Sequence, residues 1–292
     1  MNDSSQEHSV GPAGNVSLVV VTHNSATVLS PMLETLSLPE PRTFRETVFV
    51  DNGSSDGTRD LINERLPQAR LIVNGLNRGF ATAVNQGVRD SSGQLILLAN
   101  PDVRWSQEDV AVLAQFLDSH GTAAAVCPRL VYPKGGTQPS VRRFPTHANI
   151  WFSRQSPLSV LSRMVPSRHG YTLPDPSGPS CVEGIAATFM LIRREAFLAV
   201  GGMDEGYFLY VEDTDLCKRW HDAGYEVWID PRVVVTHDWQ GGSGKNPGLR
   251  RHHRDGVRRY FRTHHADKPL RNALIEGLLH LMDWWDHLRY GR

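Results

Sequence analysis

The sequence predicts an α/β fold: a Rossmann-like domain with a mostly parallel central sheet, followed by a helical C-terminal extension. Two patterns support this prediction. From Val16 to about Asp102, short aliphatic runs alternate with stretches of helical periodicity, which is typical of parallel strands joined by helices. Near the C-terminus, leucine and tryptophan recur at helical spacing. A chain of 292 residues, 40% of them hydrophobic, can bury the core of one large α/β domain with an appendage.

The N-terminal half is expected to alternate between strands and helices. Its strands are predicted at residues 16–22, 47–50, 70–73 and 94–99. Its helices are predicted where apolar residues recur three or four positions apart, at 25–36, 58–66 and 80–89. A fourth helix is expected to follow Ser106 and to run to about Leu117, because Ser106 and Asp109 have the spacing of a capping box.

The C-terminal half is expected to begin with a long irregular segment. Residues 132–180 contain eight prolines among Gly, Ser and Arg, so we expect a loop that is functional or mobile. Regular structure is predicted to resume after it, with strands at 184–192, 226–229 and 233–236 and helices at 195–200 and 211–223. The chain then divides into a disordered lead at 1–14, the main domain at 15–243 and the C-terminal extension at 244–292.

The C-terminal extension is basic and amphipathic. Between Lys245 and Arg271 there are nine Lys or Arg, four His and two acids. A helix is then predicted with one apolar stripe, made of Leu270, Leu274, Leu278, Leu281, Trp285 and Leu288, and with Arg271, His280, Asp283 and His287 on the other side. Two interpretations stay open. The extension meets an anionic membrane surface, or the stripe packs on the main domain or forms a homo-oligomer contact.

Composition excludes several classes of protein. The 31 Lys and Arg balance 31 Asp and Glu, which argues against nucleic-acid binding through bulk positive charge. Three distant cysteines without a CxxC pair exclude a disulfide scaffold and a cysteine zinc site and suit a reducing compartment. No apolar run approaches a membrane span, so we expect a cytoplasmic protein, with peripheral attachment to the inner face of the membrane left open.

Polar side chains follow each strand of the predicted parallel sheet. They are Thr22-His23-Asn24, Asp51-Asn52-Gly53-Ser54, Asn77-Arg78-Gly79 and Asn100-Pro101-Asp102. Ligands bind at the carboxyl ends of such strands, so these segments predict a polar crevice. There, Asp51 could accept an N–H from uracil or thymine, and Asp102 offers the hard oxygen that Mg²⁺ or Mn²⁺ prefers. The alternative is that each segment is only a turn and a helix cap.

Two further groups are candidates for chemistry. Glu212, Asp213 and Asp215 lie in the first turn of a predicted helix, where the helix dipole favours the ionised form that a general base needs. Stabilisation of the helix is the alternative explanation. His237 follows a β-branched strand and precedes a Gly-rich loop, so it is either a metal ligand or a structural histidine.

Several nucleotide and hydrolase signatures are absent. The chain has no GxGxxG, no GxxxxGK and no GxSxG motif, so dinucleotide dehydrogenases, P-loop phosphotransferases and α/β-hydrolases find no motif support.

The order of the motifs resembles that of the family 2 glycosyltransferases, which are inverting enzymes of the GT-A fold. The resemblance runs from about Val16 to Ser243, through Val-Val-Thr-His-Asn, Val-Asp-Asn-Gly-Ser-Ser-Asp-Gly, Asn-Arg-Gly-Phe-Ala-x-Ala-x-Asn, Asn-Pro-Asp and Phe-x-Tyr-x-Glu-Asp-x-Asp-Leu-x-x-Arg. The runs Arg142-Arg143-Phe144-Pro145-Thr146 and Met190-Leu191-Ile192-Arg193-Arg194 resemble the rhamnosyltransferase branch of the family.

The resemblance implies a donor site and a metal site. It implies that the nucleotide is bound by Thr22, Asn24, Asp51, Arg78, Asn100 and Asp102. Asn100-Pro101-Asp102 occupies the place of the family's Asp-x-Asp motif, with an amide in place of the first carboxylate. Asp102 and His237 are therefore the implied ligands of Mg²⁺ or Mn²⁺.

The resemblance also implies functions for the residues expected near the acceptor and the diphosphate. Asp213 would be the general base that deprotonates the acceptor hydroxyl. Arg142 or Arg143 would close over the diphosphate from the Pro-rich loop. Glu212 and Asp215 would orient the base or hold the acceptor.

The implied activity is transfer of one sugar, best matched by L-rhamnose from dTDP-L-rhamnose, to a hydroxyl of a lipid-diphosphate-linked sugar in cell-wall or surface polysaccharide assembly. The Gln-x-x-Arg-Trp motif of the family's processive synthases is missing, which favours single transfer. Two alternatives remain: a nucleotidyltransferase that activates a sugar phosphate, and a non-catalytic nucleotide-sugar-binding protein.

Overall fold

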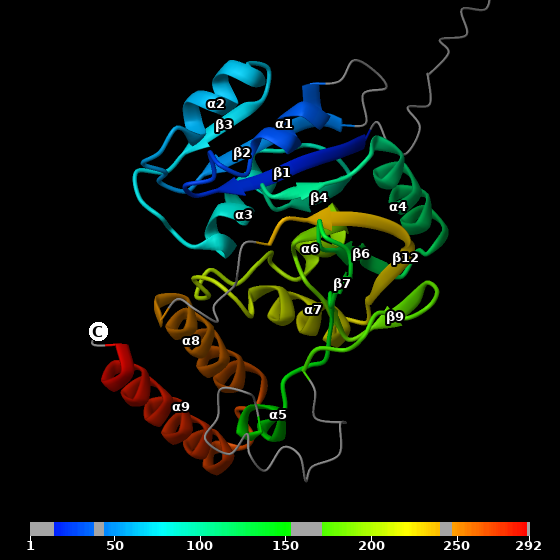
Figure 1. Cartoon of the computed structure of the whole chain (residues 1–292). Coiled ribbons are helices and arrows are strands. Elements are labelled where there is room, and N and C mark those ends of the chain that lie inside the picture. The colour runs from blue at the N-terminus through cyan, green and yellow to red at the C-terminus, as the bar shows by residue number, and fades with distance from the viewer. Residues whose placement is uncertain (1–14, 38–43, 153–170, 240–246, 291–292) are drawn as a thin grey trace, which may run out of the picture.

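The computed structural model describes residues 15–37, 44–152, 171–239 and 247–290 of the chain (Figure 1). The expected disordered lead, 1–14, lies outside these residues. A ten-stranded mixed sheet forms the centre of the molecule, with the strand order β3-β2-β1-β4-β11-β6-β12-β5 and with β7 and β9 at its margins. No helix in the described part of the chain has the length and apolarity needed to cross a bilayer.

The first half of the sheet is parallel, as predicted. Its strands are β1 (Val16–Thr22), β2 (Phe44–Asp51), β3 (Arg70–Val73) and β4 (Leu95–Ala99). They are connected through α1 (Ser30–Ser37), α2 (Thr58–Arg65) and α3 (Phe80–Arg89). Helix α1 begins at Ser30 rather than at residue 25, because Pro31 lacks an N–H and suits only the first helical turn.

The second half of the sheet alternates in direction. β11 (Phe189–Arg193) is antiparallel to β4 and to β6 (Ala123–Val131), while β12 (Glu226–His237) is parallel to β6 and antiparallel to β5 (Val103–Arg104). Sequence analysis assigns no element to β6, since its alanine-rich, fully buried start shows neither alternation nor strong β-propensity. The two strands predicted at 226–236 form one strand, β12, with an irregularity between Asp230 and Val234.

The strand predicted at 184–192 is divided in the structure. β10 (Gly184–Ile185) leaves the main sheet and pairs with β8 (Val141–Arg142), whereas β11 stays in it. The expected loop at 132–180 therefore contains β7 (Thr137–Gln138), β8, α5 (His147–Trp151) and β9 (Ser180–Val182), with residues 153–170 outside the description. The break at residues 186–188 matters for the site described below.

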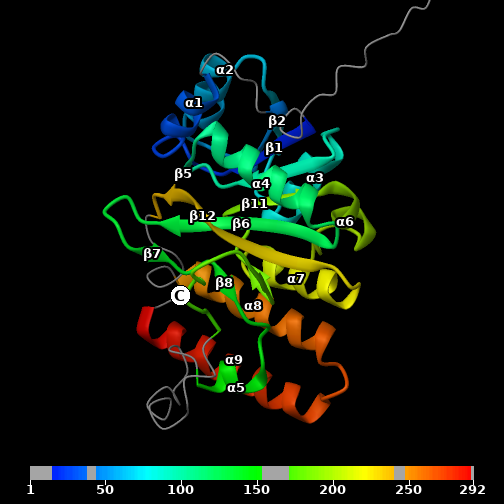
Figure 2. The ribbon, with the colours of Figure 1, turned by 90° about the vertical axis from the view of Figure 1, so that its right-hand side faces the viewer.

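Helices cover both faces of the sheet and make three layers (Figures 1 and 2). One apolar core packs α1, α2 and α4 (Gln107–Ser119) against β1, β4 and β6. The other core packs α3, α6 (Arg194–Ala199) and α7 (Glu212–Asp222) against the opposite face. The predicted capping box of α4 is confirmed, because Asp109 N–H donates to Ser106 Oγ and Ser106 N–H donates to Asp109.

The C-terminal extension is helical, as predicted, and forms a hairpin of α8 (Pro247–His264) and α9 (Pro269–Tyr290) beyond α7 (Figure 2). A separate apolar cluster joins the hairpin to Tyr207 and Val211 of the main domain. The expectation that the Leu270–Leu288 stripe packs on the main domain is wrong for five of its six members, since only Leu278 is buried. The buried row of α9 is instead Ile275, Leu278, Leu279 and Met282.

Candidate active site

The ends of β1 and β2 meet around a buried carboxylate. Asp51 is fully buried; its oxygens accept hydrogen bonds from the Thr22 hydroxyl (3.3 Å) and the Ser54 N–H (3.1 Å), and Arg59 lies 3.8 Å away. Asn24, in the left-handed region with φ 51°, accepts from the Ser55 N–H at 2.9 Å. These contacts bring Thr22, Asn24 and Asp51 together, while the contact of Asp51 with a base stays a prediction.

Asn52 holds the end of β2 against the segment that follows β3. Its Oδ1 accepts the Arg78 N–H at 3.0 Å, and its Nδ2 donates to Asn77 Oδ1 at 2.8 Å and to the Gly79 carbonyl at 3.1 Å. Arg78 itself is exposed at the rim. Sequence analysis includes Asn52 in a motif but assigns it no function. Its amide, which can donate and accept hydrogen bonds at once, is the signal that could have identified it.

Asp102 and His237 lie side by side at the end of β4 and β12, with His237 Nε2 3.2 Å from Asp102 Oδ1. The other ring nitrogen, Nδ1, lies 2.7 Å from Gln138 Oε1. The orientation of that amide follows from a second contact, because Gln138 Nε2 donates to the His237 carbonyl at 2.9 Å. Oε1 is thus an acceptor, so Nδ1 carries a proton, and Nε2 is the ring nitrogen that faces Asp102.

This arrangement fits a divalent cation. His237 Nε2 and Asp102 Oδ1 lie 3.2 Å apart, so one cation could bind both an imidazole nitrogen and a carboxylate oxygen here once Nε2 carries no proton. An outer hydrogen bond that fixes the tautomer, as Gln138 provides, is the usual support of a histidine ligand. Three or more His, Cys, Asp or Glu do not converge anywhere in the described residues, so the remaining ligands would come from the donor diphosphate and water.

A strained turn precedes the acidic motif. Tyr210 and Val211 both have positive φ, 70° and 74°, and for a β-branched valine this conformation is a true outlier. Such strain costs about 1–3 kcal/mol per residue and persists only where neighbours hold it. The turn directs the chain abruptly into α7, whose first residue is Glu212.

The three acids of α7 differ in their surroundings. Asp215 is fully buried, with Tyr207, Arg219 and His264 as partners. Glu212 is buried as well, and this burial, with the adjacent Asp213 charge, raises its pKa to about 8. Asp213 is half-buried and accepts the Thr214 N–H at 2.7 Å, so it is the acid of the turn that lies at a helix N-terminus and is also partly exposed.

The segment between β10 and β11 links Asp213 to the Asn100–Asp102 loop. The Ala187 N–H points at Asp213 Oδ2 (3.4 Å), and the carbonyl of the next residue, Thr188, accepts the Asn100 N–H at 2.9 Å. Two adjacent residues thus contact the acidic turn and the Asn100–Asp102 loop at once. The residues at which the predicted strand is divided, 186–188, therefore connect the acidic turn to the Asn100–Asp102 loop.

Comparison with known proteins agrees with this geometry. The family model described as "Glycosyl transferase family 2" matches residues 17–201. The chain belongs to glycosyl transferase family 2. It is therefore a glycosyltransferase, and this excludes the nucleotidyltransferase alternative. A second model, described as "N-terminal domain of galactosyltransferase", matches residues 170–238, which include the acidic turn and His237.

Two curated relatives are rhamnosyltransferases. The "N-acetylglucosaminyl-diphospho-decaprenol L-rhamnosyltransferase" of Mycobacterium tuberculosis is 32% identical over 260 residues, 81% of each chain. "Rhamnosyltransferase WbbL" of Escherichia coli K12 is 30% identical over 229 residues, 76% of this chain and 83% of its own. Among solved structures, the mannosyltransferase PcManGT of Pyrobaculum calidifontis, in complex with GDP-Man and Mn²⁺, covers 94% of this glycosyltransferase and 73% of its own chain at TM-score 0.58 and 19% identity, a likeness of fold.

Arg142 lies beside the acidic turn of the glycosyltransferase. Desolvation and the like charge of Asp213 dominate the pKa of Glu212, and the Arg142 charge opposes them. Desolvation, assisted by Arg142, lowers the pKa of His253 in α8 to about 4. The Arg142 guanidinium also lies 5.7 Å from the centre of the Tyr171 ring. Because β8 pairs with β10, Arg142 sits on a strand and not on the loop that sequence analysis expects.

Arg143 is the neighbour of Arg142 on the same stretch of chain. Its N–H donates to the Tyr171 carbonyl at 2.8 Å, so its backbone is fixed to the segment that follows the undescribed residues. The Arg142 charge acts on Glu212.

Helix α8 packs against the acidic turn. Sequence analysis does not predict this contact. His264 Nε2 lies 2.7 Å from Asp215 Oδ1. At Gly256 a Cβ would lie 2.7 Å from the Tyr210 carbonyl oxygen and 3.1 Å from a Val211 methyl, so only glycine permits this approach. The extension of the glycosyltransferase is thus part of the support for its strained turn. Asp215 is expected to orient the base or hold the acceptor. In the structure its side chain contacts His264 of α8.

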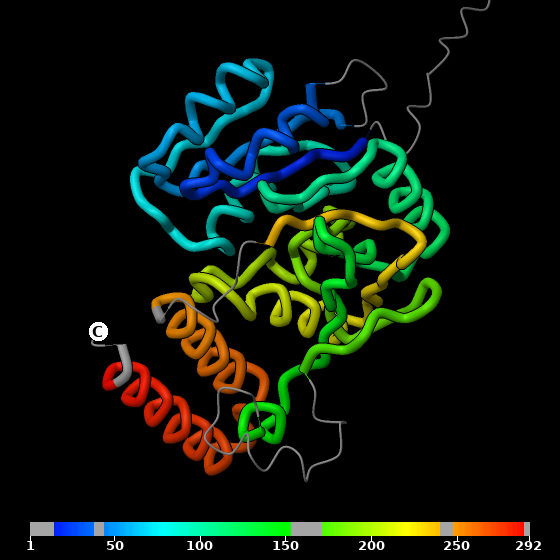
Figure 3. Tube along the Cα trace, in the orientation of Figure 1, coloured from blue at the N-terminus to red at the C-terminus, as the bar shows by residue number. Residues whose placement is uncertain are grey.

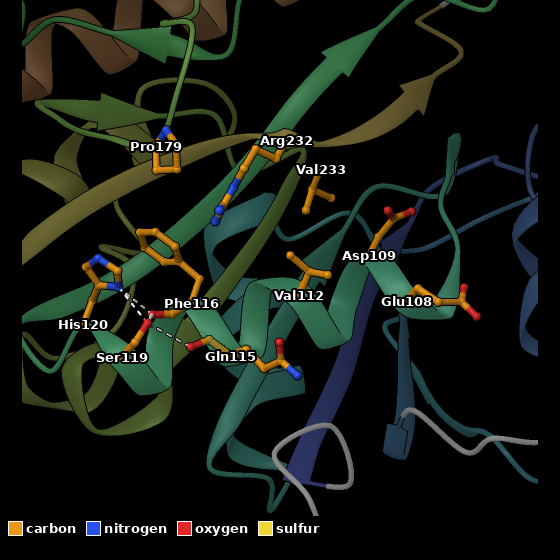
Figure 4. A pocket seen from close by; sticks show the side chains of 10 residues that line it. All are labelled: Glu108, Asp109, Val112, Gln115, Phe116, Ser119, His120, Pro179, Arg232 and Val233. Carbon is orange, nitrogen blue, oxygen red and sulfur yellow. Dashed lines mark hydrogen bonds between the residues drawn. The ribbon is translucent and has the colours of Figure 1, made fainter.

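A hollow of about 690 Å³ lies elsewhere, over α4 (Figure 4). Val112, Phe116 and His120 line it together with Arg232 of β12. Because α4 belongs to the core on the sheet face opposite to α7, this hollow is separate from the acidic turn. No residue predicted for the site lines it.

Proposed function

We propose that the chain is an inverting, metal-dependent rhamnosyltransferase. It would move L-rhamnose from dTDP-L-rhamnose to a hydroxyl of a sugar carried on a polyprenyl diphosphate, in cell-wall or surface polysaccharide assembly. The observation that carries the proposal is that Ala187 and Thr188 link the half-buried Asp213 to the Asn100–Asp102 loop, where Asp102 contacts His237. The names of the mycobacterial and E. coli relatives support the choice of rhamnose.

The donor would lie across the ends of β1 to β4. Thr22, Asn24 and Asp51 would bind the nucleoside, with Arg78 at the rim and the Asn100–Asp102 loop under the diphosphate. Mg²⁺ or Mn²⁺ held by Asp102 and His237 would offset the negative charge that grows on the leaving diphosphate. Arg142 would contribute positive charge from the other side, since it already acts on the acidic turn.

The acceptor would enter beside Asp213. Its hydroxyl oxygen would attack the anomeric carbon from the face opposite the diphosphate, and its proton would pass to the Asp213 carboxylate. The new C–O bond forms as the bond to the diphosphate oxygen breaks, so the anomeric configuration inverts. Glu212, largely protonated at neutral pH because of its raised pKa, would add no second negative charge to the turn.

The reaction would take place at the inner face of the cytoplasmic membrane. A nucleotide sugar is a water-soluble donor, whereas a polyprenyl-diphosphate sugar is held in the bilayer. The protein would therefore be cytoplasmic and peripheral, working at the boundary between the two substrates.

Transfer is tested directly with dTDP-L-rhamnose and a short-chain, water-soluble N-acetylglucosaminyl diphosphate ester. We expect a rhamnosylated product of inverted configuration, identified by NMR, with no transfer in EDTA and recovery on addition of Mg²⁺ or Mn²⁺. UDP-galactose and UDP-N-acetylglucosamine serve as donor controls. Transfer from one of these and not from dTDP-rhamnose would contradict rhamnose as the sugar. Binding of dTDP without transfer to this ester would contradict the proposed acceptor.

A further inference from the structure

Helix α9 has two apolar faces, and one of them is uncovered. Its inner face packs on α8 through Ile275, Leu278, Leu279 and Met282. Its outer face carries side chains that are 47–83% exposed, namely Leu270, Leu274, Leu281, Trp284, Trp285 and Leu288. At 100° per residue these six lie within about 100° of the helix circumference. Figure 1 shows α9 at the margin of the molecule, with α8 between it and the sheet domain.

The acids of α9 all point away from this face. Glu276, Asp283 and Asp286 form ion pairs with arginines of α8, namely Arg250, Arg254, Arg258 and Arg262. Four of the nine Lys and Arg of the basic stretch are thus paired with acids of α9 inside the hairpin, which weakens the expected attraction to anionic headgroups. The outer face itself, in the described part of α9, has no carboxylate beside it that a lipid phosphate would repel.

We propose that the outer face of α9 lies in the headgroup region of a lipid bilayer, with the helix axis parallel to the membrane plane. Exposed leucines and two adjacent tryptophans on one face of a helix are typical of such interfacial helices, because indole rings prefer the boundary between water and hydrocarbon. Arg271, exposed at the edge of the face, adds a charge of the sign that anionic lipids attract.

A second copy of the chain fits this face less well. Nineteen residues of helix, from Leu270 to Leu288, span about 28 Å. Six large apolar side chains along one narrow strip are well below the roughly 20–30 residues that each partner of a stable interface contributes. A planar bilayer has no such minimum, because every exposed side chain of the strip can enter it.

The placement has a consequence for the reaction, and here the inference rests on the proposed function. Packed helices lie about 8–10 Å apart, and α8 contacts the acidic turn directly through Gly256 and His264. A membrane-bound α9 would therefore hold Asp213 within about two helix layers of the headgroups. A sugar carried on a polyprenyl diphosphate would have to reach Asp213 across that distance.

Vesicle flotation of the full chain tests the inference. We expect the protein to float with phosphatidylcholine vesicles that contain phosphatidylglycerol, and still to float in about 1 M NaCl, where the Debye length is about 3 Å. The double variant Trp284→Ser/Trp285→Ser should lower the partition coefficient about tenfold or more, because two large aromatic surfaces are lost. Leu198→Ser, at a position 56% exposed on α6, is the matched control and should float normally.

Three outcomes would overturn the inference: no flotation of the unaltered protein, flotation that 1 M NaCl abolishes, or a stable dimer in analytical ultracentrifugation that the tryptophan variant dissociates. Activity separates this inference from the proposed function. The double variant should keep transfer to the short-chain soluble acceptor and lose at least tenfold with a long-chain acceptor embedded in vesicles. An equal loss on both acceptors would show that the tryptophans support the fold and not the membrane contact.

Discussion

His264 of α8 contacts Asp215 of α7, with Nε2 2.7 Å from Oδ1, and thereby joins the C-terminal extension to the helix that carries the proposed general base. The two residues are 49 positions apart in the sequence, and both side chains are at least nine-tenths buried. Asp215 also bonds to Tyr207 and Arg219. The Asp215 carboxylate therefore contacts three parts of the chain: Tyr207 before the strained turn, Arg219 of α7 and His264 of the extension.

This junction predicts that His264 is a positioning residue. His264→Ala removes a partner of a buried carboxylate, which costs about 1–3 kcal/mol of stability. Because the change acts through the acidic turn and not on the nucleotide side, we expect kcat to fall about tenfold while the KM for the donor stays constant. His264→Gln, which keeps a donor at a similar reach, should recover most of the activity. His280→Ala on the exposed side of α9 is the control. A donor KM that rises together with the fall in kcat would contradict a positioning part.

Asp213 is expected to be the base. Asp213→Asn keeps the size of the side chain and an oxygen that can accept the Thr214 N–H, so the variant should fold and should bind dTDP as tightly as the unaltered protein. Transfer should fall about 10²–10⁴-fold, the usual contribution of general-base catalysis. Single-turnover kinetics measures the loss of transfer, and titration calorimetry with dTDP measures the affinity for the nucleotide. Near-normal transfer by Asp213→Asn would assign the base elsewhere, with Glu212 as the next candidate.

Sequence analysis predicts the parallel half of the fold, and it names most residues that the structure brings together in the candidate site, because these lie in short motifs at the ends of regular strands. Sequence analysis does not predict contacts between segments that are far apart in the sequence. Gln138 lies in a two-residue strand within a Pro-rich stretch, 99 positions from His237. Nothing local marks such a residue as the partner of His237. The outer face of α9 shows another limit, since periodicity places leucines on one stripe but does not tell which stripe of a helix is buried.

Gln138 is predicted to control metal affinity. Gln138→Leu removes the acceptor that holds the proton on Nδ1 of His237, so the ring loses its fixed tautomer and orientation. Loss of such an outer contact typically costs about 10–100-fold in metal affinity. We expect the Mn²⁺ concentration for half-maximal activity to rise by that factor, with full activity regained at saturating metal. Direct Mn²⁺ binding, measured by electron paramagnetic resonance in the presence of dTDP, checks the result. An unchanged Mn²⁺ requirement would mean that His237 is not a ligand.

Glu212 should make the stability of the protein depend on pH. Its pKa is about 8 in the folded chain, chiefly because of burial and then because of the Asp213 charge, against 4.5 for an unperturbed glutamate. Below pH 4.5 both the folded and the unfolded chain hold the proton, and Glu212 costs nothing. As the pH rises from 4.5 to about 8, the unfolded chain ionises first, so the free energy of unfolding falls until both forms are ionised.

Glu212→Gln removes this penalty while it keeps the shape of the side chain. The variant should therefore be more stable than the unaltered protein at pH 8–9, by on the order of a few kcal/mol since one pKa unit corresponds to about 1.36 kcal/mol, and no more stable at pH 4. Urea unfolding across this range measures the difference. Glu64→Gln, at an exposed position of α2, makes the same change of charge and should leave the pH profile unaltered. A Glu212→Gln curve parallel to that of the unaltered protein would show that Glu212 is already ionised in the folded chain, in which case two adjacent carboxylates, and not Asp213 alone, would face the acceptor.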